Sequence, residues 1–328
     1  MSKENILITG ATGFIGSHVL GRLLEESYPV VAIVRKRSNY KNVEDLERKG
    51  AILVEGMFYE NEVLEKVFGD YSIQHVVHIA ALRGGGNGTR RAYYTVNVMG
   101  TEALLKVSLA HKIKRFIYFS SVGVLGTIPR DLPGDLHSEF NGDNAYHDSK
   151  ILAERKLNEY IEMGLDAFIL RPTITYGVGD NGFSRTLVEL VKRRMLLPPS
   201  RDIKIHLLDV VTLTDLVVNI LKTEGLQQRV FIAADETPIS LRELVDQISR
   251  YYHGTEYPAF LKLPEVVYKA LLFGLRVIHN EKWLTRLLLI SNNWYYDISA
   301  TIRALHFEPA KTDCSFIKRM CNVFSATG

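Results

Sequence analysis

The sequence predicts an α/β fold built on a parallel, doubly wound sheet with helices on both faces. Three observations predict it. Short, nearly continuous apolar runs recur through the first half of the chain, stretches with helical periodicity alternate with them, and a glycine-rich turn joins the first run to the first helix. Strands that are apolar on both sides belong inside a parallel sheet, because the crossover helices cover both of its faces.

The expected strands and helices follow one another in order. We expect strands at 6–9, 30–34, 52–54, 75–79, 116–119 and 167–170, and helices at 14–26, 60–68, 93–110 and 146–163. The alternation weakens after Arg171, and Pro198-Pro199 marks a break. Beyond it the pattern predicts a return to the sheet at 230–233 and helices at 241–251 and 263–278.

Composition limits the class of protein. The 328 residues suffice for two domains, or for one large domain with an appended lobe. The formal net charge of +3 gives no reason to expect a nucleic-acid partner. Cys314 and Cys321 fit no metal or redox spacing, and we expect no metal site. The chain opens on a strand pattern, and charges and a proline interrupt the apolar stretch 261–278, so we expect a cytoplasmic protein without a membrane span.

The turn after the first strand has the chemistry of a phosphate site. The run is Gly10-Ala11-Thr12-Gly13-Phe14-Ile15-Gly16. Its glycines let the backbone approach a pyrophosphate, and the helix N-terminus adds N–H donors and positive potential. With a strand before it and a helix after it, the motif predicts a dinucleotide site rather than a simple turn. We therefore expect a Rossmann-type NAD(P)-binding domain over residues 1–172. A smaller C-terminal substrate lobe would occupy most of 173–328, with some segments returning to the sheet.

The end of the second strand indicates which dinucleotide is bound. NAD-binding units place an acid about twenty residues beyond the glycines, where it holds the ribose hydroxyls. Here the strand is followed by Arg35-Lys36-Arg37-Ser38. A guanidinium can pair with a 2′-phosphate that a carboxylate would repel. A solvated basic loop is the alternative, but the position favours NADP, with NAD possible, and Arg35 and Ser38 as contacts.

A tyrosine and a lysine are spaced for proton transfer. Tyr146 and Lys150 lie four residues apart at the start of a helix, so they share one face. A phenol titrates near pH 10, but a nearby ammonium and an oxidised nicotinamide ring both favour the phenolate. The phenol can then exchange a proton with the reacting oxygen as hydride moves. Ser121, after the strand at 116–119, is placed to hold the same oxygen.

These motifs together resemble the extended short-chain dehydrogenase/reductase family, also called the NAD-dependent epimerase/dehydratase family. The resemblance runs from Ile6 to about Pro309. Besides the glycine turn it rests on His78-Ile79-Ala80-Ala81, Asn97-Val98-Met99-Gly100-Thr101, Ser120-Ser121, Tyr146 with Lys150, and Arg171-Pro172 with Tyr176-Gly177.

The resemblance implies roles for individual residues. Ser121, Tyr146 and Lys150 would form the catalytic triad, with Lys150 also on the nicotinamide ribose, and Asn97 would shape its helix and support the proton relay. The remaining cofactor contacts would be Gly10, Thr12, Gly13, Phe14, Ile15, Gly16, Ala80, Ala81, Ser120 and Pro172. In the family, the counterparts of the helices at 93–110 and 146–163 pair across a two-fold axis, so a homodimer is implied.

Some positions depart from the family pattern. The usual Gly-Asp-Leu after the third strand is Gly56-Met57-Phe58, so Met57 and Phe58 would lie at the adenine without the acid that contacts it. Leu125 replaces an aromatic residue, and His147-Asp148 replaces small residues between Tyr146 and Lys150. None of these changes removes a catalytic group.

The implied function is hydride transfer at a secondary alcohol or ketone, with a nucleotide-activated sugar as the leading substrate. Arg35 tilts the prediction toward a net reductase over an epimerase, because NADPH is the usual cellular reductant. A ketone reductase similar to 3β-hydroxysteroid dehydrogenases or dihydroflavonol reductases is the alternative, since the helix at 263–278 resembles the lobe of the steroid enzymes. A non-catalytic NADP-sensing regulator is the alternative from another class, although such members typically lose the tyrosine or the lysine.

Two further features have structural interpretations. His78 ends an apolar strand, and we expect it to pack or hydrogen-bond rather than to act as an acid or base. The helix at 263–278 could lie on a membrane surface, but packing on the core of the lobe is the simpler expectation.

Overall fold

The computed structural model describes residues 4–36, 40–83, 88–278, 280–312, 316–317 and 319–321. Seven parallel strands form its main sheet in the order β3-β2-β1-β4-β5-β6-β10, which confirms the predicted doubly wound α/β fold. The strands are β1 (Ile6–Thr9), β2 (Val30–Val34), β3 (Ile52–Glu55), β4 (His75–His78), β5 (Arg115–Phe119), β6 (Ala167–Pro172) and β10 (Val230–Ala233). Ser38, a predicted cofactor contact, lies outside the described residues.

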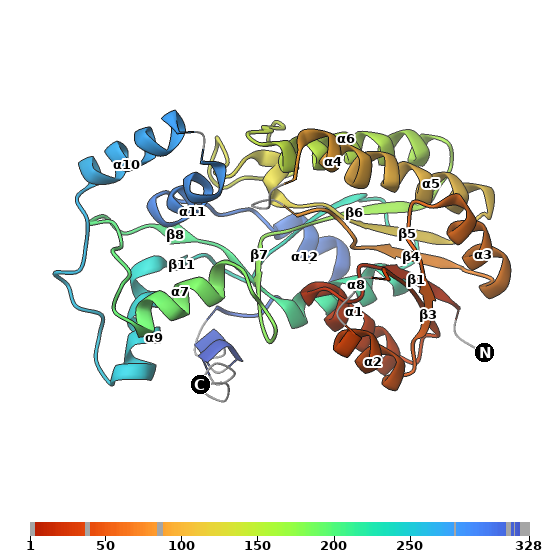
Figure 1. The fold of residues 1–328 in the computed structure, drawn as a ribbon, viewed down its shortest axis with the longest axis horizontal. Helices are drawn as coiled ribbons and strands as arrows, with labels where there is room; N and C mark the ends of the chain where they lie inside the picture. Colours follow the sequence, from red (N-terminus) through yellow and green to blue (C-terminus); the bar gives the residue numbers. More distant parts are fainter. Residues whose placement is uncertain are drawn as a thin grey trace.

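Helices cover both faces of this sheet, as Figure 1 shows. On one face lie α3 (Asn61–Tyr71), α5 (Gly100–Ala110) and α6 (Ala145–Glu162). On the other lie α1 (Phe14–Glu25), α2 (Tyr40–Arg48), α8 (Val210–Lys222) and α12 (Ser299–Leu305). Each layer buries its own apolar cluster against strands that are apolar on both sides, which is why those strands appear as unbroken apolar runs in the sequence.

The helix expected at 93–110 is assembled from three segments. A short α4 (Arg90–Tyr93) passes into a π-helical turn, η1 (Tyr94–Met99), and then into α5. Single π-turns inside helices are uncommon and are often found at functional sites. Here the wider turn contains Asn97, one of the predicted site residues, whose side chain is buried.

The remaining elements form the C-terminal lobe, on the left of Figure 1. Trp294 and Tyr176 are fully buried in its core. The elements beyond β6, apart from β10, α8 and α12, are β7 (Ile174–Tyr176), α7 (Phe183–Lys192), β8 (Lys204–Ile205), β9 (Leu207–Asp209), β11 (Ile239–Ser240), α9 (Leu241–His253), α10 (Glu265–Val277) and α11 (Glu281–Ser291). The short strands pair as β7 with β9 and as β8 with β11.

The expectation that the helix at 263–278 packs on the core of the lobe is wrong for most of its length. Tyr268 is the one buried residue of α10. The helix packs against α11 and otherwise projects from the corner of the lobe (Figure 1). Among the described residues, no helix is both long and apolar enough to span a bilayer.

Candidate active site

The first part of the candidate site lies where the strand order reverses, between β1 and β4. The two strands run side by side, with Thr9 opposite His78, so the turns that follow them meet. Gly10 has φ +79°, and a Cβ built there would lie 2.7 Å from the Ala80 nitrogen. A Cβ on Gly16 would lie 2.1 Å from the Gly10 oxygen. Only glycine fits at either position, and ligands of open α/β sheets bind at this kind of reversal.

The glycine turn leads into the N-terminus of α1. Gly13 is the N-cap residue and supplies no side chain to cap the helix. A bound anion would therefore meet backbone N–H groups and the positive end of the helix. Thr12, Phe14 and Ile15 are half-buried around the turn, and Gly13 is exposed. The residues present thus fit a dinucleotide pyrophosphate.

His78 joins the two turns through hydrogen bonds, as expected. Its Nδ1 lies 2.7 Å from the Thr9 hydroxyl, which also accepts a hydrogen bond from the Ala80 N–H at 3.2 Å. Its Nε2 lies 3.0 Å from the Thr101 hydroxyl, which donates to the Asn97 carbonyl at 2.7 Å. Because Thr101 uses its proton there, the ring proton of His78 belongs on Nε2. Burial lowers the pKa of His78 to about 3, so it is neutral and structural.

Asn97 fastens the segment after β4 to the start of α6. Its amide donates to the Leu82 carbonyl at 3.0 Å and to the Ser149 hydroxyl at 2.9 Å, and its oxygen accepts from the Leu82 N–H at 2.7 Å. Ser149 in turn donates to the Tyr146 carbonyl at 2.7 Å. Asn97 therefore holds the backbone of Tyr146 and of the segment that contains Ala80 and Ala81, both half-buried.

Tyr146 and Ser121 come together at the carboxyl end of β5. The Ser121 hydroxyl accepts a hydrogen bond from the Gly123 N–H at 3.0 Å and also hydrogen-bonds the phenol of Tyr146. Burial raises the pKa of Tyr146 to about 12, although the hydrogen bond with Ser121 lowers it in part. From the sequence, a nearby ammonium is expected to lower the pKa of Tyr146. In this structure burial dominates instead, and Lys150 is not among the groups that shift it.

Lys150 is almost fully buried, one turn further along α6 than Tyr146. Its ammonium donates to the Phe119 carbonyl at 2.6 Å and lies 4.7 Å from the centroid of the Tyr118 ring. Burial lowers the pKa of Lys150 to about 7, with an opposing contribution from Glu154. At physiological pH the Lys150 side chain is therefore close to the midpoint of its titration, where the charged and neutral forms are equally populated.

A buried ion pair that was not predicted from the sequence lies one turn beyond Lys150. Glu154 accepts two hydrogen bonds from Arg171, at 3.0 and 2.6 Å, and a third from the Ser120 hydroxyl at 2.5 Å. Ser120, predicted to line the cofactor, is buried and turned toward this carboxylate. The four-residue spacing of Tyr146, Lys150 and Glu154 was the available signal, because it places all three on one helical face.

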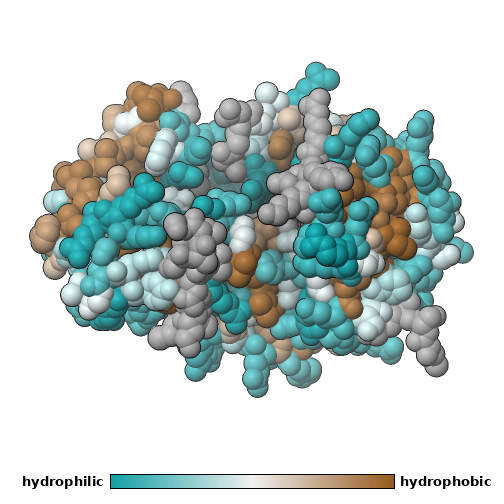
Figure 2. Space-filling view, turned by 60° about the horizontal axis from the view of Figure 1, so that its bottom comes forward, coloured by the Kyte–Doolittle hydropathy of each residue, from teal (hydrophilic) through white to brown (hydrophobic). Residues whose placement is uncertain are grey.

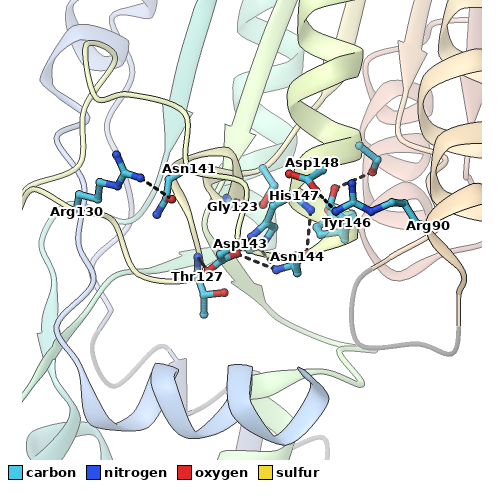
Figure 3. A network of polar contacts seen from close by, with 12 residues as sticks. Arg90, Gly123, Thr127, Arg130, Asn141, Asp143, Asn144, Tyr146, His147 and Asp148 are labelled. Atoms are coloured by element: carbon cyan, nitrogen blue, oxygen red, sulfur yellow. Dashed lines mark hydrogen bonds and ion pairs between the residues drawn. The ribbon is translucent and has the colours of Figure 1, made fainter. Parts of the chain in front are cut away.

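A second polar cluster fixes the loop that follows Ser121 (Figure 3). His147 Nδ1 donates to Asp143 at 2.5 Å, and the same carboxylate accepts from the Thr127 N–H at 2.8 Å. The His147 ring lies where a Cβ on Gly123 would be, 2.4 Å away. His147, a departure from the family pattern, is therefore accommodated by Gly123 and links α6 to the segment η2 (Val122–Leu125).

The predicted adenine and nicotinamide contacts occupy varied environments. Arg35 is exposed directly after β2, and Met57 is half-buried after β3. The Phe58 ring is buried 4.9 Å from the His78 ring, so it belongs to the core of the sheet layer. Pro172 is buried at the carboxyl end of β6.

Comparisons with known proteins identify relatives of this chain. The chain is 31% identical over 169 residues to UDP-glucose 4-epimerase of Homo sapiens, a match that covers 48% of each chain. The chain thus spans about half the length of the curated relatives it matches. The Bordetella bronchiseptica enzyme WbmG, solved with NAD, superposes with a TM-score of 0.78 at 20% identity, over 100% of this chain and 96% of WbmG.

UDP-glucose 4-epimerase of Thermotoga maritima, solved with UDP-glucose, also superposes with a TM-score of 0.78, at 21% identity over 98% of this chain and 99% of that enzyme. At such identities these two structures establish the fold. The model of the NAD dependent epimerase/dehydratase family matches residues 6–237, most of the chain. This protein therefore belongs to the NAD dependent epimerase/dehydratase family.

Proposed function

We propose that this protein is an NAD(P)-dependent enzyme that transfers a hydride at a secondary alcohol or ketone of a nucleotide-activated sugar. The observation that carries the proposal is the contact between Tyr146 and Ser121, with Lys150 buried one turn further along α6 and a glycine turn that fits a pyrophosphate after β1. The names of the relatives, which are UDP-glucose 4-epimerases, support the substrate class. In this proposal residues 173–328 supply most of the substrate lobe.

Each site residue has a proposed role in binding or in proton transfer. The backbone of 10–16 and the N-terminus of α1 would hold the pyrophosphate, and the bound nicotinamide would supply or accept the hydride. Ser121 would hold the reacting oxygen, and Tyr146 would exchange its proton with that oxygen. Lys150 would hold ribose hydroxyls, and a positive charge on it or on the cofactor would favour the phenolate. Asn97 would keep Tyr146 in place through Ser149.

The proposed cofactor is NADP, with NAD as the alternative. Arg35 is exposed after β2, where the ribose is bound in this fold. Arg35→Asp should shift the ratio of the two dissociation constants toward NAD by about tenfold or more, because a carboxylate repels the 2′-phosphate. Titration of tryptophan fluorescence with each cofactor measures the ratio, and Lys49→Asp, also at an exposed basic residue, is the matched control. Equal shifts in both variants would remove Arg35 from the ribose site.

The proposed redox cycle is a net reduction, and epimerisation is the second candidate because the relatives are epimerases. A reductase consumes one NADPH per product, whereas an epimerase returns the hydride and leaves its cofactor unchanged. The test uses a UDP-4-keto sugar with NADPH and, separately, UDP-glucose with catalytic NAD⁺ or NADP⁺. Stoichiometric loss of absorbance of the reduced nicotinamide supports the reductase. UDP-galactose formed without net absorbance change would establish the epimerase instead.

We also propose a homodimer that uses the outward faces of η1 and α6. Tyr94 and Met99 of η1 and Leu152 of α6 are exposed apolar side chains, and α4, η1 and α6 pack together on one face of the sheet. Exposed apolar groups gathered on neighbouring helices are typical of subunit interfaces. Light scattering at micromolar concentration should give twice the chain mass of 37.2 kDa, and Leu152→Glu should halve it. A monomeric wild type would exclude this dimer.

A further inference from the structure

A surface on the lobe carries large apolar side chains in contact with solvent. Phe260 is 81% exposed, Val266 76%, Phe273 68% and Ile278 67%. With Val277 they form what we call the α10 surface. Figure 2 shows extensive apolar surface at the left end of the molecule, the end at which Figure 1 places α10. Single exposed apolar residues are ordinary, but Val266, Phe273 and Val277 lie on one helix, and such a group requires an explanation.

The helical geometry of α10 makes this surface continuous. Val266, Ala270, Phe273 and Val277 recur at intervals of four, three and four residues, and all four are exposed. Residues at that spacing line one face of a helix. Tyr268 is buried, and Leu272 and Leu275 are half-buried, on the face that packs against α11. The helix therefore has one apolar face with a partner and a second apolar face in solvent.

Basic residues are in excess in the segment that contains the α10 surface. The charged residues of α10 itself are Glu265, Lys269 and Arg276, which by the same periodicity form a narrow stripe between its two apolar faces. Lys269 forms an ion pair with Glu265 at 3.3 Å. Segment 260–291 has five basic side chains against two acidic ones, although the whole chain is only +3. The basic residues are Lys262, Lys269, Arg276, Lys282 and Arg286.

We propose that the α10 surface binds an anionic phospholipid bilayer, with α10 lying in the plane of the membrane interface. The combination of a wide apolar face with Lys and Arg beside it is the pattern of interfacial amphipathic helices. The basic side chains face phosphate headgroups while their alkyl stems lie along the apolar face. Trp283, 55% exposed at the start of α11, is a residue type enriched at that depth.

The charge of segment 260–291 and the length of α10 favour a bilayer as the occupant. The 13 residues of α10 extend about 20 Å, less than the ~30 Å hydrocarbon core, so the helix can lie on a bilayer but not cross it. An apolar protein partner, or a second copy of this chain, would cover the same side chains without needing an excess of positive charge. A second copy would also bring the same basic residues together, which costs free energy.

Vesicle flotation tests the proposal with the full chain. The vesicles contain phosphatidylcholine alone or with about 30 mol% phosphatidylglycerol, enough to give a negative surface potential. We expect the wild type to float with the anionic vesicles, and at least tenfold less with the neutral ones. Phe273→Ser with Val277→Ser should abolish flotation by removing apolar contact. Lys269→Glu with Arg276→Glu should lower the partition coefficient by about tenfold or more.

Matched controls separate membrane binding from unfolding and from self-association. Ile52→Ser changes an exposed apolar residue on β3, at the other end of the molecule, and should float like the wild type. Thermal melts of every variant check the fold. No flotation of a folded wild type, equal flotation with both kinds of vesicle, or wild-type flotation of the two α10 variants would each overturn the proposal. Sedimentation showing self-association that Phe273→Ser with Val277→Ser removes would assign the surface to a second copy.

Discussion

Helices α6 and α10 both depart from the usual rule that charged side chains are exposed and apolar ones are buried, and they do so in opposite ways. Helix α6 buries Lys150 and Glu154 in the interior, whereas α10 exposes Val266 and Phe273 to solvent. Lys and Glu are rarely fully buried without partners, and those of α6 have partners at 2.6–3.0 Å. The second apolar face of α10, which contains Val266 and Phe273, is exposed among the described residues. The buried charges of α6 are thus compensated by partners inside the chain, whereas the exposed apolar face of α10 requires a partner outside it.

The comparison separates two kinds of departure from binary patterning. In α6 the charged side chains are buried, so each one depends on a neighbouring partner. Removing one partner leaves the other charge buried without compensation. In α10 the apolar side chains are exposed, so removing one of them leaves no cavity. Natural sequences depart from these rules mainly at functional sites. The variants below should therefore produce large losses in α6 and small ones in α10, except in the presence of a membrane.

The largest effect is expected at Tyr146. Tyr146→Phe keeps the ring but removes the proton that would pass to the reacting oxygen, so turnover should fall by ~10²–10⁴-fold. Cofactor affinity should stay within about twofold. Tyr160→Phe is the matched control, because it makes the same change further along α6. Steady-state kinetics and cofactor titration measure both. Unchanged turnover in Tyr146→Phe would favour a non-catalytic NADP-sensing protein.

The next largest effect is expected at Glu154. Glu154→Gln leaves the guanidinium of Arg171 buried without a counter-charge, which should cost about 3–5 kcal/mol in the free energy of unfolding. Urea denaturation measures it. The control Glu159→Gln lies on the same helix, with its side chain 51% exposed beside Lys156, and should leave the midpoint unchanged. Equal midpoints for both variants would mean that the buried pair contributes nothing to stability.

Lys150 should give a smaller, pH-dependent effect. Burial lowers its pKa from 10.5 to about 7. Between these values the unfolded chain binds a proton that the folded chain does not, so stability from this group increases with pH. The slope is at most about 1.4 kcal/mol per pH unit. Urea denaturation at pH 7 and pH 9 should show the wild type gaining stability relative to Lys150→Met. A difference that stays constant would mean that Lys150 is charged in the folded protein.

Sequence patterns predicted the sheet well because its strands depend on local periodicity, and the proposed proton-transfer residues rest on the same kind of short-range pattern. The apolar runs, the glycine spacing and the interval between Tyr146 and Lys150 are all visible over a few residues. The ion pair of Glu154 with Arg171 joins α6 to the end of β6, with a sequence separation of 17 residues, so only the folded sheet brings the two side chains together. The same holds for the packing of the Phe58 ring against His78, whereas the expected contact of Phe58 with adenine stays a prediction.

The prediction that α10 packs on the core of the lobe was wrong for a related reason. Its apolar pattern specifies a helix with apolar faces, but it does not specify whether protein covers each face. Tyr268 and its half-buried neighbours fit the expected packing on one side. The chain supplies nothing comparable for the side that contains Phe273, because α10 packs mainly on α11. The periodicity of a sequence shows that a helix face is apolar, but it does not show which molecule covers that face.

The smallest effect on stability is therefore expected at Phe273, and it completes the contrast with α6. Its side chain is 68% exposed, so Phe273→Ser removes little buried area and creates no cavity. The free energy of unfolding should change by at most about 0.5 kcal/mol. Phe168→Ser, in the fully buried strand β6, should cost at least about 3 kcal/mol. Urea denaturation of both variants measures the ratio. A loss at Phe273 approaching that at Phe168 would show that protein covers this face in solution, and the α10 surface would then belong to an interface between chains.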